Sequence, residues 1–423
     1  MPDQPPHSRR PQRGRSNLPT SSTLDDSDSS FSRPPFVTAA PPESDNGESL
    51  TSEERRSVAN RLASLAHLSP VEIERQLMDR GYRGQPFARR AGAVLAYRHL
   101  ARLRREFLDG IDPDTLPPRE NYLFLGATGS GKTYLVELLF RDILQVPTLV
   151  TDVTRCSETG YVGDDVQMLL SQLHEAAGQD RGWASCGVIC LDEFDKLAAS
   201  RSNARFAGEG TTKDVSGFGV QRSLLTLLSG KSSPFPTDFG FSGHGTRMIL
   251  PLGNLIFIAA GAFSGLRETA ELSKADFGIG FSAHPKPHAD DSLVARIGAE
   301  LLENTRAFSG YGILPELVGR FSRLVPFQPL EEEVLREILE DTLIANYRNE
   351  FRHEGIELEI RDAVIDHVVH AAHRRETGAR GLRASLVPPL EEAAFQTFGH
   401  HTPGRVVVDL VDGEIRVESE LRA

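Results

Sequence analysis

The fold is decided by a glycine-rich stretch that follows an apolar run at 122–125: Gly126-Ala127-Thr128-Gly129-Ser130-Gly131-Lys132-Thr133. A turn of this composition between a strand and a helix is the pattern of the phosphate-binding P-loop. Its glycines let backbone N–H groups surround phosphate oxygens, and the helix N-terminus adds a favourable dipole. Lys132 supplies a cation, and the Thr133 hydroxyl is suited to bind Mg²⁺. The stretch therefore predicts a nucleotide site on a strand, a loop and a helix.

Short apolar runs predict the sheet that carries this loop. They are continuous rather than alternating, which is typical of strands buried on both faces. Helix-compatible segments separate them, as in a parallel sheet with crossover helices. In chain order the runs are Tyr122–Leu125, Thr148–Val150, Val188–Leu191, Leu255–Ala259 and Leu324–Phe327. We expect an α/β fold with a five-stranded parallel sheet.

The third run ends in two carboxylates, Asp192 and Glu193. At the carboxyl end of a strand near a P-loop, Asp192 is suited to hold Mg²⁺ and Glu193 to act as a general base toward water. An isolated Asp-Glu pair would instead indicate the acidic first turn of a helix. The combination with the P-loop favours the hydrolytic interpretation.

Two arginines are candidates for contact with phosphate charge, because a guanidinium group stays charged and bridges oxygens. Arg320 precedes the fifth apolar run, where it can be presented to a neighbouring subunit. Arg380 begins a predicted helix near the C-terminus, from which it can reach back to the nucleotide. Spacing alone leaves a surface or helix-capping role equally open for each.

Two further loops carry apolar residues between glycines. Gly160-Tyr161-Val162-Gly163 follows the second run, and Phe277-Gly278-Ile279-Gly280-Phe281 lies in a region rich in Gly, Pro, His and Asp. From composition alone, a strand-to-helix turn with Tyr161 packed on the core is preferred for the first. An exposed apolar tip is costly unless a partner covers it, so a docking role is a hypothesis for the second.

Composition excludes several classes of protein. The chain has 423 residues, a formal charge of −12 and only three cysteines, Cys156, Cys186 and Cys190. This acidity argues against a protein that coats nucleic acid, and the cysteines are too few for a disulfide framework or a zinc ribbon. No apolar run approaches the roughly 18 residues of a membrane helix. We expect a cytoplasmic protein that binds neither nucleic acid nor membrane.

The composition also divides the chain into three parts. Residues 1–56 are rich in Pro and Ser and predict a disordered tail. Residues 57–328 would form the P-loop domain with its leading helices. Residues 329–423 predict a smaller, mainly helical domain, ending in a hairpin around Asp412-Gly413.

Together these motifs resemble the ClpX family of AAA+ unfoldases, over about residues 68–398. Ser157–Val166 is similar to the pore-1 loop of that family, and Asp214–Val220 to its second pore loop. Asn254–Phe263 resembles the sensor-1 strand. The segment 312–320 carries the arginine-finger pattern, and 378–383 the sensor-2 pattern.

The resemblance implies a homohexameric ring that uses ATP and Mg²⁺ to pull unfolded or tagged polypeptides through a central pore. Tyr161 and Val162 would grip the polypeptide, since apolar contact tolerates any passing side chain. Ile279, Gly280 and Phe281 match the loop with which the family docks on the ClpP peptidase. Arg320 and Arg380 would contact the nucleotide.

The sequence also departs from the family. The family's four-cysteine zinc-binding domain is replaced by the Pro/Ser-rich tail, so no zinc is expected. Tyr82 and Arg83 replace apolar residues of the adenine-binding segment before Gly84-Gln85. Two alternatives to a protease subunit remain open: a remodelling chaperone that acts without a peptidase, and a nucleotide-gated scaffold with little turnover.

Overall fold

The computed structural model describes residues 48–156, 166–201, 217–237, 247–264, 266, 305–399 and 404–421. Four predicted segments lie wholly or partly outside the described residues: most of the N-terminal tail, the loop 160–163, the first three residues of the segment 214–220, and the loop 279–281. Within the described ranges, no helix is both long enough and apolar enough to cross a bilayer.

Five parallel strands form the central sheet, in the order β2-β3-β6-β1-β7. The five-stranded prediction is confirmed, with each strand within two residues of the predicted run. Register places Leu125 beside Gly261 and Asp152 beside Asp192, so the strands end together near the P-loop. Their bounds are β1 (Tyr122–Leu125), β2 (Thr148–Asp152), β3 (Val188–Asp192), β6 (Ile256–Gly261) and β7 (Arg323–Pro326).

Three helices precede the sheet: α1 (Ser52–Ser64), α2 (Pro70–Asp79) and α3 (Pro86–Phe107). The first begins ahead of residue 57, within the part of the chain predicted as tail. A capping box explains the earlier start, because Thr51 and Glu54 satisfy each other's backbone N–H groups. Helix α2 packs against α3 and also contacts the segment after the P-loop helix.

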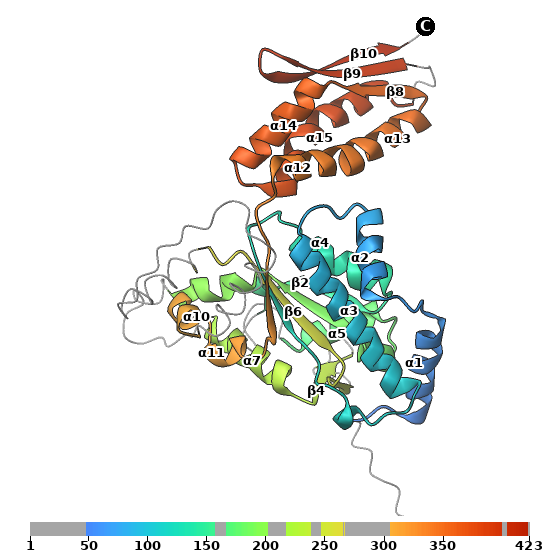
Figure 1. The fold of residues 1–423 in the computed structure, drawn as a ribbon, viewed down its shortest axis with the longest axis vertical. Helices are drawn as coiled ribbons and strands as arrows, with labels where there is room; N and C mark the ends of the chain where they lie inside the picture. The colour runs from blue at the N-terminus through green and yellow to red at the C-terminus, as the bar shows by residue number, and fades with distance from the viewer. Residues whose placement is uncertain are drawn as a thin grey trace, which may run out of the picture. The chain divides into compact units, whose positions relative to one another are not determined.

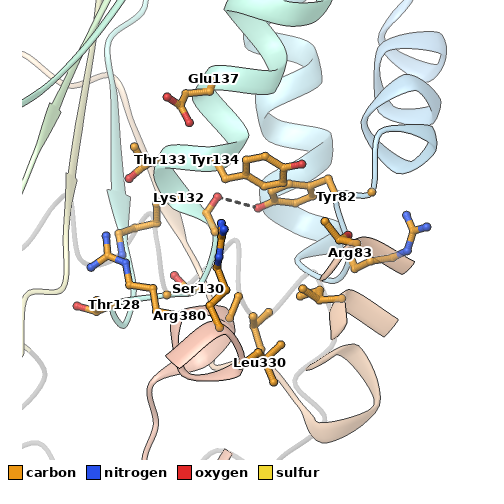
Figure 2. A pocket seen from close by; sticks show the side chains of 18 of the residues that line it. Tyr82, Arg83, Thr128, Ser130, Lys132, Thr133, Tyr134, Glu137, Leu330 and Arg380 are labelled. Atoms are coloured by element: carbon orange, nitrogen blue, oxygen red, sulfur yellow. Dashed lines mark hydrogen bonds between the residues drawn. The ribbon is translucent and has the colours of Figure 1, made fainter. Parts of the chain in front are cut away.

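The P-loop helix α4 (Lys132–Val136) continues into η2 (Glu137–Ile143), a π-helical segment (Figure 2). Other helices of this region are α5 (Met168–Ala176), α6 (Arg181–Ala184), α7 (Phe218–Ser229), α10 (Thr305–Tyr311) and α11 (Pro315–Val318). Short 3₁₀ segments are η1 (Pro113–Thr115), η3 (Val153–Arg155) and η4 (Phe194–Arg201). Strands β4 (Ser232–Pro236) and β5 (Arg247–Pro251) pair antiparallel.

The C-terminal region combines helices with a second sheet (Figure 1). Its strands β8 (Ile356–Ile360), β9 (Gly404–Val411) and β10 (Glu414–Leu421) form the order β10-β9-β8. The β9–β10 hairpin is the one predicted from Asp412-Gly413, whereas β8 was not predicted. The helical segments are α12 (Glu332–Ile338), η6 (Leu339–Ile344), α13 (Ala345–His353), α14 (Asp362–Arg374) and α15 (Gly378–Thr397).

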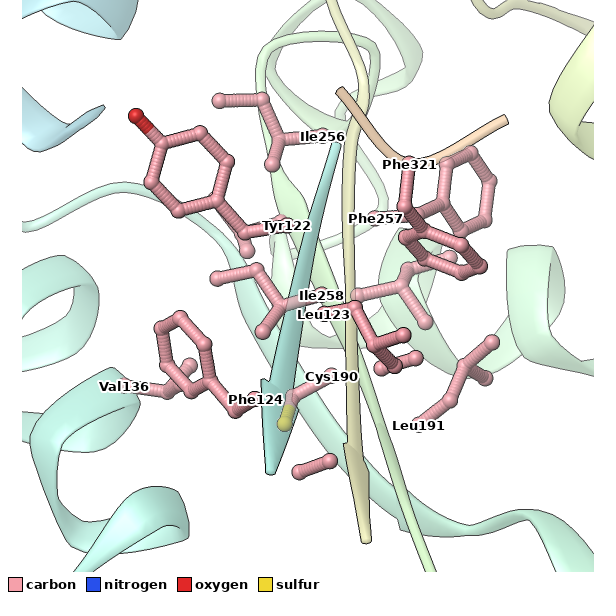
Figure 3. Close-up of a cluster of buried hydrophobic side chains, with 14 of the residues drawn as sticks. Tyr122, Leu123, Phe124, Val136, Cys190, Leu191, Ile256, Phe257, Ile258 and Phe321 are labelled. Atoms are coloured by element: carbon pink, nitrogen blue, oxygen red, sulfur yellow. The ribbon is translucent and has the colours of Figure 1, made fainter. Parts of the chain in front are cut away.

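Two separate clusters of buried apolar side chains underlie these elements. The first surrounds the parallel sheet, where Phe124, Cys190 and Ile258 point from neighbouring strands into one cluster (Figure 3). The second joins the C-terminal helices to β8 and β9, and it spans residues 330–408. Because β1, β3 and β6 are buried on both faces, their carboxyl ends form a rigid edge for the P-loop.

Candidate functional site

The predicted P-loop turns directly into a helix through a left-handed glycine. Gly131 has φ 93°, in the left-handed region, and Lys132 opens α4 directly after it. The Lys132 ammonium donates hydrogen bonds to the Gly126 and Ala127 carbonyl oxygens, at 2.7 and 2.9 Å. Burial lowers the pKa of Lys132, and the charge of Asp192 acts in the opposite direction. The loop thus curls around its own lysine.

The two predicted carboxylates lie at the end of β3, beside the P-loop. The Thr133 hydroxyl donates to Asp192 Oδ2 at 2.7 Å, so the two predicted Mg²⁺ ligands are in direct contact. The backbone N–H of Glu193 donates to Asp192 Oδ1 at 2.9 Å. Glu193 has φ 54°, an uncommon conformation for a residue with a Cβ. Its side chain is exposed and lines the cavity described next.

A cavity of about 730 Å³ opens over these residues. Its lining comes from the P-loop, the end of β3, the α2–α3 connection and the C-terminal helices (Figure 2). It brings together most of the predicted nucleotide-site residues: Tyr82, Arg83, Thr128, Gly129, Ser130, Gly131, Lys132, Thr133, Asp192, Glu193 and Arg380.

Tyr82 and Arg83 occupy different places in this lining. The Tyr82 side chain is buried, donates a hydrogen bond to the Gly131 carbonyl at 3.3 Å and stacks on Tyr134 with ring centroids 6.0 Å apart. Burial raises the pKa of Tyr82, so its hydroxyl stays protonated. Arg83 instead pairs with Asp341 on η6, through Nε at 3.1 Å and Nη2 at 2.9 Å.

The start of α15 lies directly against the P-loop. The Ala379 N–H donates to the Gly129 carbonyl at 3.2 Å, which places Arg380 in the lining of the cavity. A Cβ on Gly378 would lie 2.5 Å from the Gly129 carbonyl oxygen. Only a glycine permits this approach, since its φ of 56° is also in the left-handed region.

Sequence reasoning missed several residues of the lining. Asp195 is buried, and its Oδ1 accepts from the Ala262 N–H at 3.2 Å. Its spacing of three residues from Asp192 gave the only local hint. Tyr134 directly follows the P-loop motif, but helical spacing alone predicts no role for it. From the C-terminal helices, Asn346, Tyr347 and Glu350 also line the cavity, and nothing local to their sequence predicts this. Arg383 lines it too, at the end of the segment 378–383 that resembles the sensor-2 pattern.

Three predicted nucleotide-site residues lie outside this lining: Gly126 and Ala127, whose carbonyls accept from Lys132, and Arg320. Arg320 is exposed, is not part of the cavity lining, and its carbonyl oxygen accepts from Asn121 Nδ2 at 3.1 Å. The fold of its own chain therefore does not bring Arg320 to the cavity. The pore-loop residues 160–163 and the docking residues 279–281 lie outside the described residues.

The residues present fit a nucleotide with Mg²⁺. The buried Ser130 hydroxyl of the P-loop has no hydrogen-bond partner within the described part of the chain, which leaves a donor for a phosphate oxygen. Among the same residues there is no cluster of His, Cys, Asp or Glu that could hold a metal ion by itself. A hydroxyl and one carboxylate suit Mg²⁺, which usually keeps several water ligands and binds substrate phosphates.

Comparison with known proteins agrees with this geometry. Residues 122–282 match the family "ATPase family associated with various cellular activities (AAA)". Residues 330–396 match the "C-terminal, D2-small domain, of ClpB protein". The fold and site therefore define an AAA ATPase, a class whose activity implies ATP and Mg²⁺.

Several curated proteins cover most of the chain. One is the "ATP-dependent Clp protease ATP-binding subunit ClpX" of Azotobacter vinelandii, 34% identical over 82% of this chain and 78% of its own length. Another is "ATP-dependent Clp protease ATP-binding subunit ClpX 3" of Methylococcus capsulatus, 36% identical over 86% of this chain and 87% of its own. The ClpX of Bacteroides thetaiotaomicron is 31% identical over 82% of each chain. The chain belongs to the ClpX family.

Proposed function

We propose that this ATPase is a homohexameric protein unfoldase, which threads tagged or unfolded polypeptides through a central pore and delivers them to a ClpP-type peptidase. The observation that carries the proposal is the cavity in which Lys132, the Thr133–Asp192 pair, Glu193 and Arg380 converge. It is supported by similarity to proteins whose printed names describe subunits of an ATP-dependent Clp protease.

Each residue of the site has a proposed part in turnover. The P-loop N–H groups and Lys132 would bind the phosphates, and Thr133 and Asp192 would hold Mg²⁺. The bound Mg²⁺ would withdraw negative charge from the terminal phosphates. Glu193 would orient and deprotonate the attacking water. Arg380 from its own subunit, and Arg320 from a neighbouring one, would contact phosphate oxygens.

The remaining assignments rest on the family. Gly160, Tyr161, Val162 and Gly163 would form the loop that grips the substrate, and Ile279, Gly280 and Phe281 would dock on the peptidase. The proposed division of the chain is a tail, a large ATPase domain to residue 328 and a small domain from 329. The protein would act in the cytoplasm without zinc, and it would bind neither nucleic acid nor membrane.

An unfolding assay tests the proposal. The full chain with ATP should abolish the fluorescence of a tagged fluorescent protein, and a Lys132→Ala variant should not. Tyr161→Ala should keep ATP hydrolysis but lose most unfolding, because it removes the gripping ring and leaves the nucleotide site intact. Phosphate release by wild type at the Lys132→Ala background would support the scaffold alternative. Unchanged unfolding by Tyr161→Ala would contradict the assignment of the pore.

A further inference from the structure

The connection between α2 and α3, residues 81–85, contacts both the P-loop and the C-terminal helices. On the P-loop side, the Tyr82 hydroxyl donates to the Gly131 carbonyl, and Gln85 Nε2 donates to the Ser130 carbonyl at 3.4 Å. On the other side, Gln85 exchanges hydrogen bonds with the backbone N–H and carbonyl of Gln328, at 3.0 and 2.6 Å. This short segment therefore links the phosphate site to the start of the C-terminal region.

The outer edge of the same segment packs closely on α12 and η6. A Cβ on Gly84 would lie 2.9 Å from Val334 Cγ1, and a Cβ on Gly81 would lie 3.3 Å from Thr342 Oγ1. Arg83 adds an ion pair there, with Asp341 at 2.9 Å and with Glu337 at 4.0 Å. The contact is thus both steric and electrostatic.

The donors of Arg83 are largely used within the protein. Its Nε and Nη2 both bond to Asp341 Oδ2, and its Nη1 donates to the Met78 carbonyl at 2.5 Å. A guanidinium held in this way has few donors left for a nucleotide base. The side chain is 25% exposed and that of Asp341 51%, so water screens the pair only in part.

The Arg83–Asp341 pair lies away from the point where the chain passes into the C-terminal region. The chain passes from β7 to α12 through residues 327–331, and the Gln85–Gln328 bonds lie at this crossing. The Arg83–Asp341 pair lies farther along the C-terminal helices, on η6. Two contacts, one at the crossing and one beyond it, fix a rotation that a single contact leaves free.

We propose that Arg83 is a positioning residue, whose ion pair with Asp341 fixes α12 and η6 against the P-loop and so holds the walls of the cavity together around the nucleotide. The inference rests on the proposed nucleotide site and concerns its regulation by contact between the two regions. Salt or a competing charge at Asp341 would weaken this contact and, with it, nucleotide binding.

Binding of a fluorescent ADP analogue to the full chain, at low and at high salt, tests this inference. Arg83→Ala and Asp341→Asn should each weaken binding about two- to fivefold at low salt, the range of measured coupling in exposed ion pairs. The double variant should be no weaker than the single ones, and the differences should vanish near ~0.5 M salt. ATP hydrolysis should show a raised KM with kcat unchanged, because the reacting groups stay in place.

Two further variants make the test specific. Exchanging the charges, Arg83→Asp with Asp341→Arg, should restore binding that either reversal alone loses. Glu340→Gln is the matched control, since Glu340 lies on the same segment but pairs with Arg336 within the C-terminal region, at 3.0 Å. It should bind nucleotide as wild type does. If Arg83→Ala does not fold, Asp341→Asn alone tests the ion pair. The Asp341 side chain is 51% exposed, so this substitution should not prevent folding.

Three results would overturn the inference. One is additive losses in the double variant, and another is an equal loss for Glu340→Gln. The third is a changed preference between ATP and GTP in Arg83→Ala without any effect of Asp341→Asn, which would assign Arg83 to the base instead. Absence of unfolding activity would contradict the proposed function and leave these binding results valid.

Discussion

Glu193 holds a left-handed backbone conformation that costs a residue with a Cβ roughly 1–2 kcal/mol. Strain of this kind persists where the surroundings fix it, and it is frequent at functional sites. Here the fixed end of β3 and the bond from the Glu193 N–H to Asp192 hold the residue at the mouth of the cavity. The strain is consistent with a carboxylate placed for reaction rather than for packing.

Replacing Glu193 by Gln should therefore abolish turnover and keep nucleotide binding. The amide keeps the shape of the side chain but removes the proposed base, so we expect at least a ~100-fold loss of phosphate release. Glu175→Gln, which removes the same charge from an exposed position on α5, is the control and should retain the wild-type rate. Turnover of Glu193→Gln within a few-fold of wild type would assign the base elsewhere.

A second residue-scale prediction concerns His99, which is fully buried on α3 and bonds to the Cys186 carbonyl at 2.8 Å. Burial lowers the pKa of His99 from 6.5 to about 4. Between these values the unfolded chain binds one proton more than the folded chain. The free energy of unfolding should therefore fall as pH falls through this window, by about 2 kcal/mol from pH 7 to pH 5.

Urea unfolding at pH 7 and pH 5, followed by the fluorescence of Trp183, measures this change in the free energy of unfolding. Trp183 is the only tryptophan in the sequence and is buried. His99→Gln keeps a donor for the Cys186 carbonyl but cannot titrate in this range. Its stability should lose about 2 kcal/mol less than wild type between the two pH values. If the free energy of unfolding depended on pH equally in both proteins, groups other than His99 would cause the dependence.

At the scale of elements, a single methyl group would disturb the close approach of α15 to the P-loop. Gly378→Ala would place a Cβ 2.5 Å from the Gly129 carbonyl oxygen, so α15 must shift and carry Arg380 with it. We expect kcat for ATP hydrolysis to fall by at least ~10-fold, about 1.4 kcal/mol of barrier.

The control for this variant separates strain from displacement. Gly355 also has positive φ, at 77°, but a Cβ there would meet nothing within 4 Å. Gly355→Ala should cost roughly 1–2 kcal/mol of stability and leave the rate of hydrolysis unchanged. If both variants reduced kcat alike, general destabilisation would explain the loss, and the docking of α15 would not.

The elements also show where local patterns succeed. The parallel strands were predictable because burial on both faces leaves a continuous apolar run. Strand β8 was missed although Ile356, Leu358 and Ile360 alternate with glutamates, because the flanking helical patterns outweighed five residues. Strand β4 was not predicted because it contains two prolines, which are uncommon in strands.

Helix α15 shows the opposite case, since a Pro-Pro pair such as Pro388-Pro389 ordinarily interrupts a helix. The helix continues from Gly378 to Thr397 with both prolines inside it. The two prolines leave the carbonyls of Ala384 and Ser385 without their helical donors. Ala384 is exposed and Ser385 partly exposed, so water can satisfy these groups. Leu386 and Leu390 are buried on either side and anchor the helix across the defect.

At the scale of the whole molecule, the P-loop and the Asp192-Glu193 pair were predictable because each motif is local. The cavity was not, because its walls meet through contacts between residues more than 200 positions apart, such as Arg83–Asp341 and Gln85–Gln328. No periodicity or spacing records such a contact. The C-terminal lining, with Asn346 and Tyr347, depends on it in the same way.

The exposed position of Arg320 leads to a prediction about activity in a mixed assembly of two variants. Arg320 does not line the cavity of its own chain, so in the proposed ring it would act on a neighbour. Arg320→Ala and Glu193→Gln should each hydrolyse ATP at less than about a hundredth of the wild-type rate. The two proteins, mixed and allowed to exchange subunits, should regain activity.

The gain has a simple structural reason. In a mixed ring, some cavities combine an intact Glu193, from an Arg320→Ala chain, with an intact Arg320 from the neighbouring Glu193→Gln chain. Such pairs cannot form in either pure ring.

The control is a mixture of Glu193→Gln with Lys132→Ala/Arg320→Ala, in which no cavity combines Lys132, Glu193 and the neighbour's Arg320. If energy transfer between labelled chains showed exchange while the first mixture stayed inactive, Arg320 would not act across the interface, and its effect would have to come through the chain that carries it.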